Sequence, residues 1–391
     1  MKEVYRLQAL VFLNGLFFGS NAGSAQNWTP TAAPPQNWIS IVSSADGTKL
    51  AGAGCYGLIY TSTNSGAAWT PAGTNGALHP WTQMASSADG NKLVAVGSPT
   101  IWTSTNAGAT WTETVMSGKV WGGVASSADG SKLVVIDYNM GLIYTSPDGG
   151  STWTPTSSPV KRWRSIASSA DGTKLVAGSD YGTTYSNLPQ IYTSTNSGAT
   201  WTLTSAPNQP WQTIASSADG TRLIAGVYGG LIYLSANSGT TWTPANVPSL
   251  RWGGIASSAD GTRLAAAAWE GMIYVSADSG QSWSTAKAPN AQWQTVASSS
   301  DGIRLAAAIY DPLEGGIYTA VASPELSMTI SANAATLSWP ASASGFVLQQ
   351  NPGLETESWT DVATSGTIVN GRNRVSVSPL NARSFFRLIH R

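Results

Sequence analysis

The sequence predicts an all-β chain whose main part is a seven-bladed β-propeller with four-stranded blades. An Asp-Gly step recurs at intervals of 40 to 48 residues, at Asp46, Asp89, Asp129, Asp171, Asp219, Asp260 and Asp301. Each interval has room for four short strands, and a period of this length with four strands per unit is typical of propeller blades. The composition agrees, because 391 residues with 18 Trp, 41 Gly and only 10% charged side chains suit a compact β protein.

The first 25 residues predict a secretory signal peptide. Lys2 and Arg6 precede an apolar run from Leu7 to Phe18, and small residues follow at positions 23–25. We therefore expect cleavage after Ala25 and a mature protein that is extracellular, periplasmic or held in a bacterial cell envelope. The run is too short to cross a bilayer, which also favours a signal peptide. The alternative is that the run forms a buried N-terminal strand.

Two series of Trp residues predict how the ring closes. One series opens the innermost strand of each blade, and consists of Trp38, Trp81, Trp121, Trp163, Trp211, Trp252 and Trp293. The other series precedes the outermost strand and has six members, Trp69, Trp111, Trp153, Trp201, Trp242 and Trp283. Trp28 lies ten residues before Trp38, the same spacing that separates Trp153 from Trp163, and so supplies the missing member. The N-terminal strand is therefore expected to complete the last blade beside the strand ending at Tyr318, which removes an exposed sheet edge.

A turn with the pattern Ser-x-Asn/Asp-x-Gly-x-x-Trp precedes six of the seven outermost strands. Its Asn or Asp can bond to nearby backbone N–H groups and its Gly can adopt positive φ, so the motif predicts a structural turn. The third residue of the motif is Asn64, Asn106, Asp148, Asn196, Asn237 or Asp278. The motif resembles the Asp-box of the sialidase or bacterial-neuraminidase-repeat (BNR) superfamily. That resemblance implies a fold rather than catalysis, and the pattern is most similar to non-catalytic single propellers of the photosystem II assembly-factor type.

The repeat ends near Thr319, and residues 323–391 predict a small second domain. Short runs of alternating apolar and polar residues, such as Phe346 to Gln349, are separated by turn signals such as Asn370-Gly371. The pattern resembles fibronectin-type-III-like modules at the C-termini of bacterial secreted proteins, which implies a β-sandwich. We therefore expect a signal peptide over 1–25, a propeller over 26–322 and a sandwich over 323–391.

The charged residues that do not belong to the repeat predict where a ligand binds. Both regular turns of a blade lie on one face, so the irregular second-to-third loops and the blade-to-blade connections form the opposite face. Loops on a rigid scaffold commonly carry function, and aromatic rings beside charged groups suit polar ligands. The predicted ligand-binding residues are Asp137, Tyr138, Arg162, Arg164, Asp180, Tyr181, Tyr228, Arg251, Trp269, Glu270, Tyr310 and Asp311.

These observations favour a secreted, non-catalytic propeller that binds a glycan or a protein through its irregular face. A sialidase-like glycoside hydrolase is the first alternative, because Arg162, Arg164 and Arg251 could cluster as the sialidase arginines do. The Arg-Ile-Pro stretch of sialidases is absent, however, and a retaining glycosidase needs two carboxyl groups about 5 Å apart. The second alternative is a structural repeat protein of the envelope.

Composition also limits the partners. With 20 basic and 20 acidic side chains the formal net charge is zero, which argues against nucleic acid as the main partner. The only Cys is Cys55, and the two His residues are far apart in the sequence, so no intramolecular disulfide, metal site or cofactor is predicted. We expect a monomer without integral membrane contact.

Overall fold

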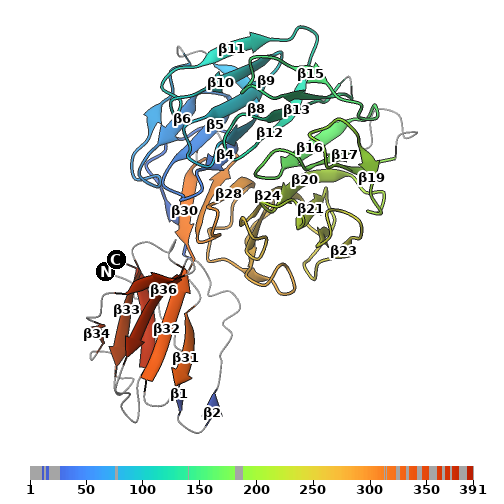
Figure 1. Cartoon of the computed structure of the whole chain (residues 1–391). Helices are drawn as coiled ribbons and strands as arrows, with labels where there is room; N and C mark the ends of the chain where they lie inside the picture. Colours follow the sequence, from blue (N-terminus) through green and yellow to red (C-terminus); the bar gives the residue numbers. More distant parts are fainter. Residues whose placement is uncertain are drawn as a thin grey trace. The chain divides into compact units, whose positions relative to one another are not determined.

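The computed structural model describes residues 11–12, 15–16, 27–74, 78–139, 141–180, 188–311, 313, 315–322, 326–331, 334–340, 346–351, 359–362, 366–369, 372–377 and 385–390. The chain divides into two compact units, one over 25–321 and one formed by 1–24 with 322–391. Every regular element in the described residues is a β-strand (Figure 1), as the sequence predicts. None of the described residues forms a helix long and apolar enough to span a bilayer.

The first unit is built from antiparallel sets of four strands. The first strands of the sets are β4 (Trp38–Ser43), β8 (His79–Ser86), β12 (Trp121–Ser126), β16 (Trp163–Ser168), β20 (Trp211–Ser216), β24 (Trp252–Ser257) and β28 (Trp293–Ser298). The second strands are β5 (Leu50–Gly57), β9 (Leu93–Gly97), β13 (Leu133–Asp137), β17 (Leu175–Ser179), β21 (Leu223–Val227), β25 (Leu264–Ala268) and β29 (Arg304–Ile309). Each first strand packs beside the next along the chain, and β28 packs beside β4.

The outer strands are shorter. The third strands are β6 (Ile59–Ser62), β10 (Thr100–Ser104), β14 (Ile143–Ser146), β18 (Ile191–Ser194), β22 (Ile232–Ser235), β26 (Ile273–Ser276) and β30 (Ile317–Val321). The fourth strands are β7 (Thr70–Pro71), β11 (Thr112–Val115), β15 (Thr154–Pro155), β19 (Thr202–Leu203), β23 (Thr243–Pro244), β27 (Ser284–Thr285) and, for the last set, β3 (Thr29–Pro30).

The predicted pairing between the two ends of the first unit is present. In β3, Thr29 pairs with Thr319 and Pro30 with Tyr318, both in β30. The Trp28 side chain is buried and its ring lies 6.0 Å from that of Trp293. The N-terminal strand thus supplies the outermost strand of the last set.

One sheet is larger than the repeat alone predicts. Cys55 pairs with Pro80 and Gly57 with His79, so β5 and β8 join the first two sets into one eight-stranded sheet. Tyr56 sits between these pairs with a φ of 52° and is 71% exposed. A single non-Gly residue with positive φ bends the strand, and this local bend lets β5 reach the neighbouring set.

The core lies between adjacent sets rather than within one of them. The seven Trp side chains that open the first strands are all fully buried. Trp163, for example, packs with Ile166 of its own strand and with Val134 and Ile136 of the preceding set. Because apolar burial drives folding, each set depends on its neighbours for stability.

Backbone hydrogen bonds between the Asp-Gly turns form a closed ring. The N–H of Ala45 donates to the carbonyl of Ala88 at 2.7 Å, and the same bond of 2.7 Å links the equivalent residue of each repeat to the next. The cycle runs through Ala45, Ala88, Ala128, Ala170, Ala218, Ala259 and Ser300, and the N–H of Ser300 returns to the carbonyl of Ala45.

The side chains of Lys49, Lys132 and Lys174 each donate to a backbone carbonyl of the next Asp-Gly turn. Lys49 Nζ donates to the carbonyl of Asp89 at 3.0 Å, and Lys174 Nζ donates to the carbonyl of Asp219 at 2.8 Å. The turn carboxylates are held by local donors instead, such as Ser169 Oγ on Asp171 at 2.6 Å.

The second turn motif uses the chemistry that its residues predict. Asp148 Oδ1 accepts hydrogen bonds from Ser146 Oγ at 2.8 Å and from the N–H of Thr152 at 2.9 Å. Asn106 Oδ1 accepts the N–H of Thr110 at 2.9 Å in the same way. Asn and Asp are thus equivalent acceptors in this turn.

The turn carboxylates make stability depend on pH. Hydrogen bonds from Ser169 and Thr173 lower the pKa of Asp171 to about 2, and those from Ser217 and Thr221 lower the pKa of Asp219 to about 2. Because these values lie below the unfolded value of about 3.9, the stabilisation is complete above about pH 4 and is lost as the pH falls towards about 2.

We therefore expect the thermal midpoint to fall steeply between about pH 4 and about pH 2. The double variant Asp171→Asn/Asp219→Asn should show a smaller fall, measured by circular dichroism across this range. Glu270→Gln is the matched control and should follow the parent. An unchanged slope in the double variant would contradict the role given to these carboxylates.

The second unit contains two sheets and a short hairpin. One sheet has the order β31 (Ser327–Ser331), β32 (Ala334–Pro340), β36 (Arg372–Val377) and β35 (Thr367–Val369). The other has the order β34 (Thr360–Asp361), β33 (Phe346–Asn351) and β37 (Phe385–His390), and the hairpin pairs β1 (Val11–Phe12) with β2 (Gly15–Leu16). The buried Arg387 donates to Gln349 Oε1 and lies 4.2 Å from the Trp359 ring centroid.

Candidate functional site

Two equivalent positions of the repeat hold seven of the predicted site residues, Tyr138, Arg162, Asp180, Tyr228, Arg251, Trp269 and Tyr310. One position follows the second strand and the other precedes the Trp of the first strand, and a backbone hydrogen bond joins them. The N–H of Asp180 donates to the carbonyl of Arg162 at 3.0 Å, and that of Trp269 to the carbonyl of Arg251 at 2.7 Å. In the same way, the N–H groups of Tyr138, Tyr228 and Tyr310 donate to the carbonyls of Val120, Pro210 and Gln292, respectively. The scaffold therefore brings side chains from separate loops to one face.

The first group of site residues is centred on Arg162. Its guanidinium carbon lies 4.2 Å from the centroid of the Tyr138 ring, and its Nε lies 3.3 Å from Asp180 Oδ1. Arg164 approaches the same Tyr138 ring at 5.7 Å. Cation–π contacts of this geometry orient a guanidinium without consuming all of its donors.

The second group is a stack of aromatic rings around Arg251. The guanidinium carbon of Arg251 lies 5.1 Å from the Tyr228 ring centroid and 4.3 Å from that of Trp269. The Trp269 ring in turn lies 5.4 Å from the ring of Tyr310. These side chains come from three consecutive repeats and lie next to one another in the order Tyr228, Arg251, Trp269 and Tyr310.

Arg164 links the two groups. It directly follows Trp163 on β16, and its Nε donates to Gln212 Oε1 of the next first strand at 3.2 Å. Burial lowers the pKa of the Arg164 guanidinium, and the nearby charges of Arg162 and Arg251 lower the pKa further while Asp180 opposes them. Arg162 and Arg251 thus both lie within electrostatic range of Arg164, and we call the three residues the arginine cluster.

Asp180 is the acidic member of the site. Burial raises the pKa of its carboxyl group, against the opposing effect of Arg162 and Arg164. Asp180 lies beside Arg162 and Arg164, and Arg251 acts on Arg164 from the other side, so the arginine cluster carries a net positive charge that attracts anions.

Other predicted residues lie apart from the arginine cluster. Asp137 is fully buried, and its Oδ2 lies 3.2 Å from Lys119 Nζ, so it forms a structural ion pair. Asp311 Oδ1 accepts the N–H of Leu313 at 2.8 Å, which is a turn contact. Glu270 is exposed next to Trp269, and Tyr181 lies outside the described residues.

The sequence interpretation missed Gln212 and the contact between Tyr310 and Cys55. Gln212 is one residue after Trp211, as Arg164 is after Trp163, so aligning the repeats on this Trp would have found it. Burial and the neighbouring Cys55 thiol raise the pKa of Tyr310. No group of His, Cys, Asp and Glu in the described part of the chain is arranged to hold a metal ion.

Comparison with solved structures identifies the fold. YCF48 from Cyanidioschyzon merolae is 17% identical with a TM-score of 0.58, covering 76% of this chain and 99% of its own. A structure of YCF48 bound to D1 peptide is 16% identical with a TM-score of 0.57, covering 77% and 98%. The β-propeller domain of Cps50 (Swd1) from Myceliophteria thermophila is 14% identical with a TM-score of 0.59, covering 76% and 100%.

These similarities show that the first unit is a β-propeller, as the repeat period predicts. No family model matches the sequence, and no curated protein matches it.

Proposed function

We propose that this chain is a non-catalytic binding protein that captures an acidic segment of another protein on the irregular face of its propeller. The observation that carries the proposal is the arginine cluster, flanked by Tyr138, Tyr228 and Trp269. Arg, Tyr and Trp are the residues that most often dominate the energy of protein interfaces. A propeller of similar fold has been solved bound to a peptide, which supports a protein ligand.

Exposed apolar side chains on the same loops support a protein partner over a small ion. Tyr228 and Met272 are both 49% exposed, and Val160 is 65% exposed. Each belongs to a second-to-third loop or to a connection between repeats. Apolar side chains around a charged, aromatic centre are typical of protein interfaces.

The electrostatics favour binding over glycoside hydrolysis. Asp137 and Asp180 are each committed to a cation, Lys119 and Arg162 respectively. Carboxylates paired in this way hold the neighbouring cations in place, which suits a binding surface.

The proposal includes the wider architecture that the sequence predicts. The propeller has seven blades, the N-terminal segment is a signal peptide, and the protein acts outside the cytoplasm. The C-terminal unit is a β-sandwich that attaches or sorts the propeller, leaving the irregular face to bind the ligand.

Panning a displayed library of random linear peptides on the full chain tests the function. We expect enrichment of peptides that combine Asp or Glu with apolar residues. For a synthetic peptide from that pool, Arg164→Gln should raise Kd by about tenfold or more, because a hydrogen bond to a charged group is lost.

The matched control is Lys132→Gln, which removes a cation from the regular face and should leave Kd unchanged. Enriched peptides without acidic residues, or equal effects of the two variants, would contradict the proposed site. Glycan-array binding that Arg164→Gln abolishes would assign the face to a carbohydrate instead.

A further inference from the structure

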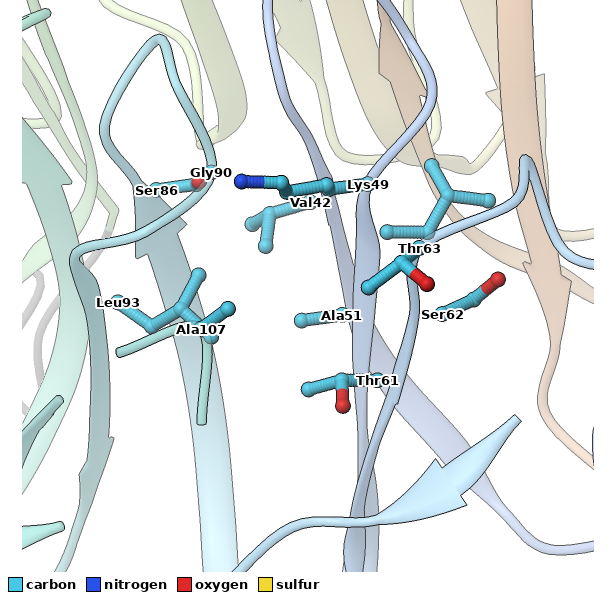
Figure 2. Close-up of a pocket in the computed structure, with 11 residues that line it drawn as sticks. Val42, Lys49, Ala51, Thr61, Ser62, Thr63, Ser86, Gly90, Leu93 and Ala107 are labelled. Atoms are coloured by element: carbon cyan, nitrogen blue, oxygen red, sulfur yellow. The ribbon is translucent and has the colours of Figure 1, made fainter. Parts of the chain in front are cut away.

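The crevice between the fifth and sixth repeats, numbered by their Asp-Gly steps, is open. It holds a cavity of about 380 Å³ lined by Arg222, Leu234, Pro244 and Ser279, among others. This volume falls in the range of small-ligand sites, roughly 300 to 1,000 Å³. The matching crevice between the first and second repeats, lined by Lys49, Gly90 and Leu93 (Figure 2), holds only about 10 Å³.

A missing hydrogen bond accompanies this opening. Ser157 Oγ donates to the carbonyl of Ala199 at 2.6 Å and Ser205 Oγ donates to the carbonyl of Thr240 at 2.7 Å, and each bond bridges a crevice to the next repeat. Asn246 occupies the equivalent position in the fifth repeat and faces Gln281. Within the described residues, Asn246 makes no such bond.

The residues around this position also make the crevice apolar. Ala245 replaces the Thr that precedes Ser157, where Thr156 Oγ1 accepts the Nε1–H of Trp201 at 3.2 Å. Leu234 occupies the position of Thr61 and Thr193 in other third strands. Its Cδ1 atom reaches the neighbouring repeat, 2.5 Å from where a Cβ on Gly280 would lie. Leu234, Pro244 and Ala245 therefore form an apolar wall of the cavity, where the third and fourth repeats carry the hydroxyl groups of Thr156-Ser157 and Thr204-Ser205.

The guanidinium group of Arg222 supplies a positive charge at the cavity. Lys49, the equivalent residue of the first repeat, is tied to the next repeat by bonds of 3.0 Å to the Asp89 carbonyl and 2.7 Å to Asn91 Oδ1. Arg222 is exposed instead, and its Nη1 donates to Ser279 Oγ at 2.7 Å. A guanidinium group presents five N–H donors in a fork that matches a carboxylate.

We propose that this crevice is a second binding site, for a small aliphatic carboxylate. The hydrocarbon chain would lie against Leu234, Pro244 and Ala245, where burial of apolar surface provides the affinity. The carboxylate would pair with the Arg222 guanidinium beside Ser279, which orients the chain into the cavity. The site lies beside the Asp-Gly and Gly-x-x-Trp turns and shares no residue with the arginine cluster.

Titration of the full chain with octanoate, and separately with octanol, tests the assignment by calorimetry. Octanoate should bind with about tenfold higher affinity than octanol, since only octanoate makes the charged hydrogen bonds. Arg222→Gln should remove this preference, because it should raise the Kd of octanoate about tenfold and leave the Kd of octanol unchanged. Lys49→Gln, in the narrow crevice, is the matched control and should change neither affinity.

Replacing residues 245 and 246 by those of other repeats tests whether the cavity is needed for binding. The double variant Ala245→Thr/Asn246→Ser restores the Thr-Ser pair of positions 156–157 and 204–205, and should close the crevice. It should keep the circular dichroism spectrum and thermal midpoint of the parent but lose octanoate binding. Equal binding of octanoate and octanol to the parent, no binding of either, or full octanoate binding by the folded double variant would overturn the proposal. So would preference for an acidic peptide over octanoate at this site.

Discussion

Replacing Trp211 by alanine should lower the free energy of unfolding by about 3 to 5 kcal/mol, the range for removing a buried aromatic side chain. Trp211 is 0% exposed and packs between two repeats against Val176, Ile191 and Leu223. Its ring lies 5.5 Å from that of Tyr233. The cavity left behind would break contacts in both repeats. Urea unfolding followed by fluorescence measures the change.

Trp242→Ala is the matched control. Trp242 closes the turn of the same repeat, is half-buried, and its Nε1 donates to the carbonyl of Gly239 at 3.1 Å. Removing the Trp242 ring should lower the free energy of unfolding by less than removing Trp211 does, because part of the Trp242 ring already contacts water. Equal losses would mean that the series of buried Trp residues is not the core of the ring.

Deleting residues 27–32 should destabilise the first unit by more than about 3 kcal/mol, because a buried Trp and a strand pairing disappear together. The deletion removes Trp28 and strand β3, along with the 2.9 Å bond from the N–H of Thr31 to the carbonyl of Ile317. It also leaves β30 with an unpaired edge. The truncated chain should therefore unfold at a lower urea concentration and aggregate more readily.

Hydrogen exchange distinguishes local fraying from opening of the ring. Amides of β30 should lose protection from exchange in the truncated chain. If the last set also separates from the first, the amide of Ser300, which donates to the Ala45 carbonyl, should lose protection as well. Trp28→Ala, which keeps the strand, should have a smaller effect on β30. A truncated chain that melts and exchanges like its parent would show that the N-terminal strand does not close the structure.

The strand order was predictable because each element carries its own marker. Six of the seven buried Trp residues start a first strand and Trp81 lies two residues inside β8, while the spacing of Trp28 places β3 in the last set. The junction of β5 with β8 was not predictable, since it depends on the positive φ of Tyr56, for which an aromatic residue gives no signal. The large cavity near Leu234 was missed for a similar reason, because it arises from differences of one or two side chains between repeats.

For the candidate site, the sequence indicated the residues but not their partners. Subtracting the repeated charges singled out Arg162, Arg164 and Arg251. The stacking of Arg251 between Tyr228 and Trp269, and the separate pairing of Asp137 with Lys119, depend on loop geometry between neighbouring repeats. A one-dimensional pattern does not encode such geometry.

The cycle of backbone hydrogen bonds through Ala45 and Ser300 has a consequence for how this chain can evolve. Near-identical tandem repeats promote unequal recombination, which adds or removes one whole repeat at a time. In an open solenoid such a change only alters the length of the stack. Here every N–H donor of the cycle already has an acceptor, so adding or removing a repeat requires the cycle to open and close again. Variation should therefore accumulate as substitutions within repeats, of the kind that distinguish Leu234 from Thr193 in equivalent strands.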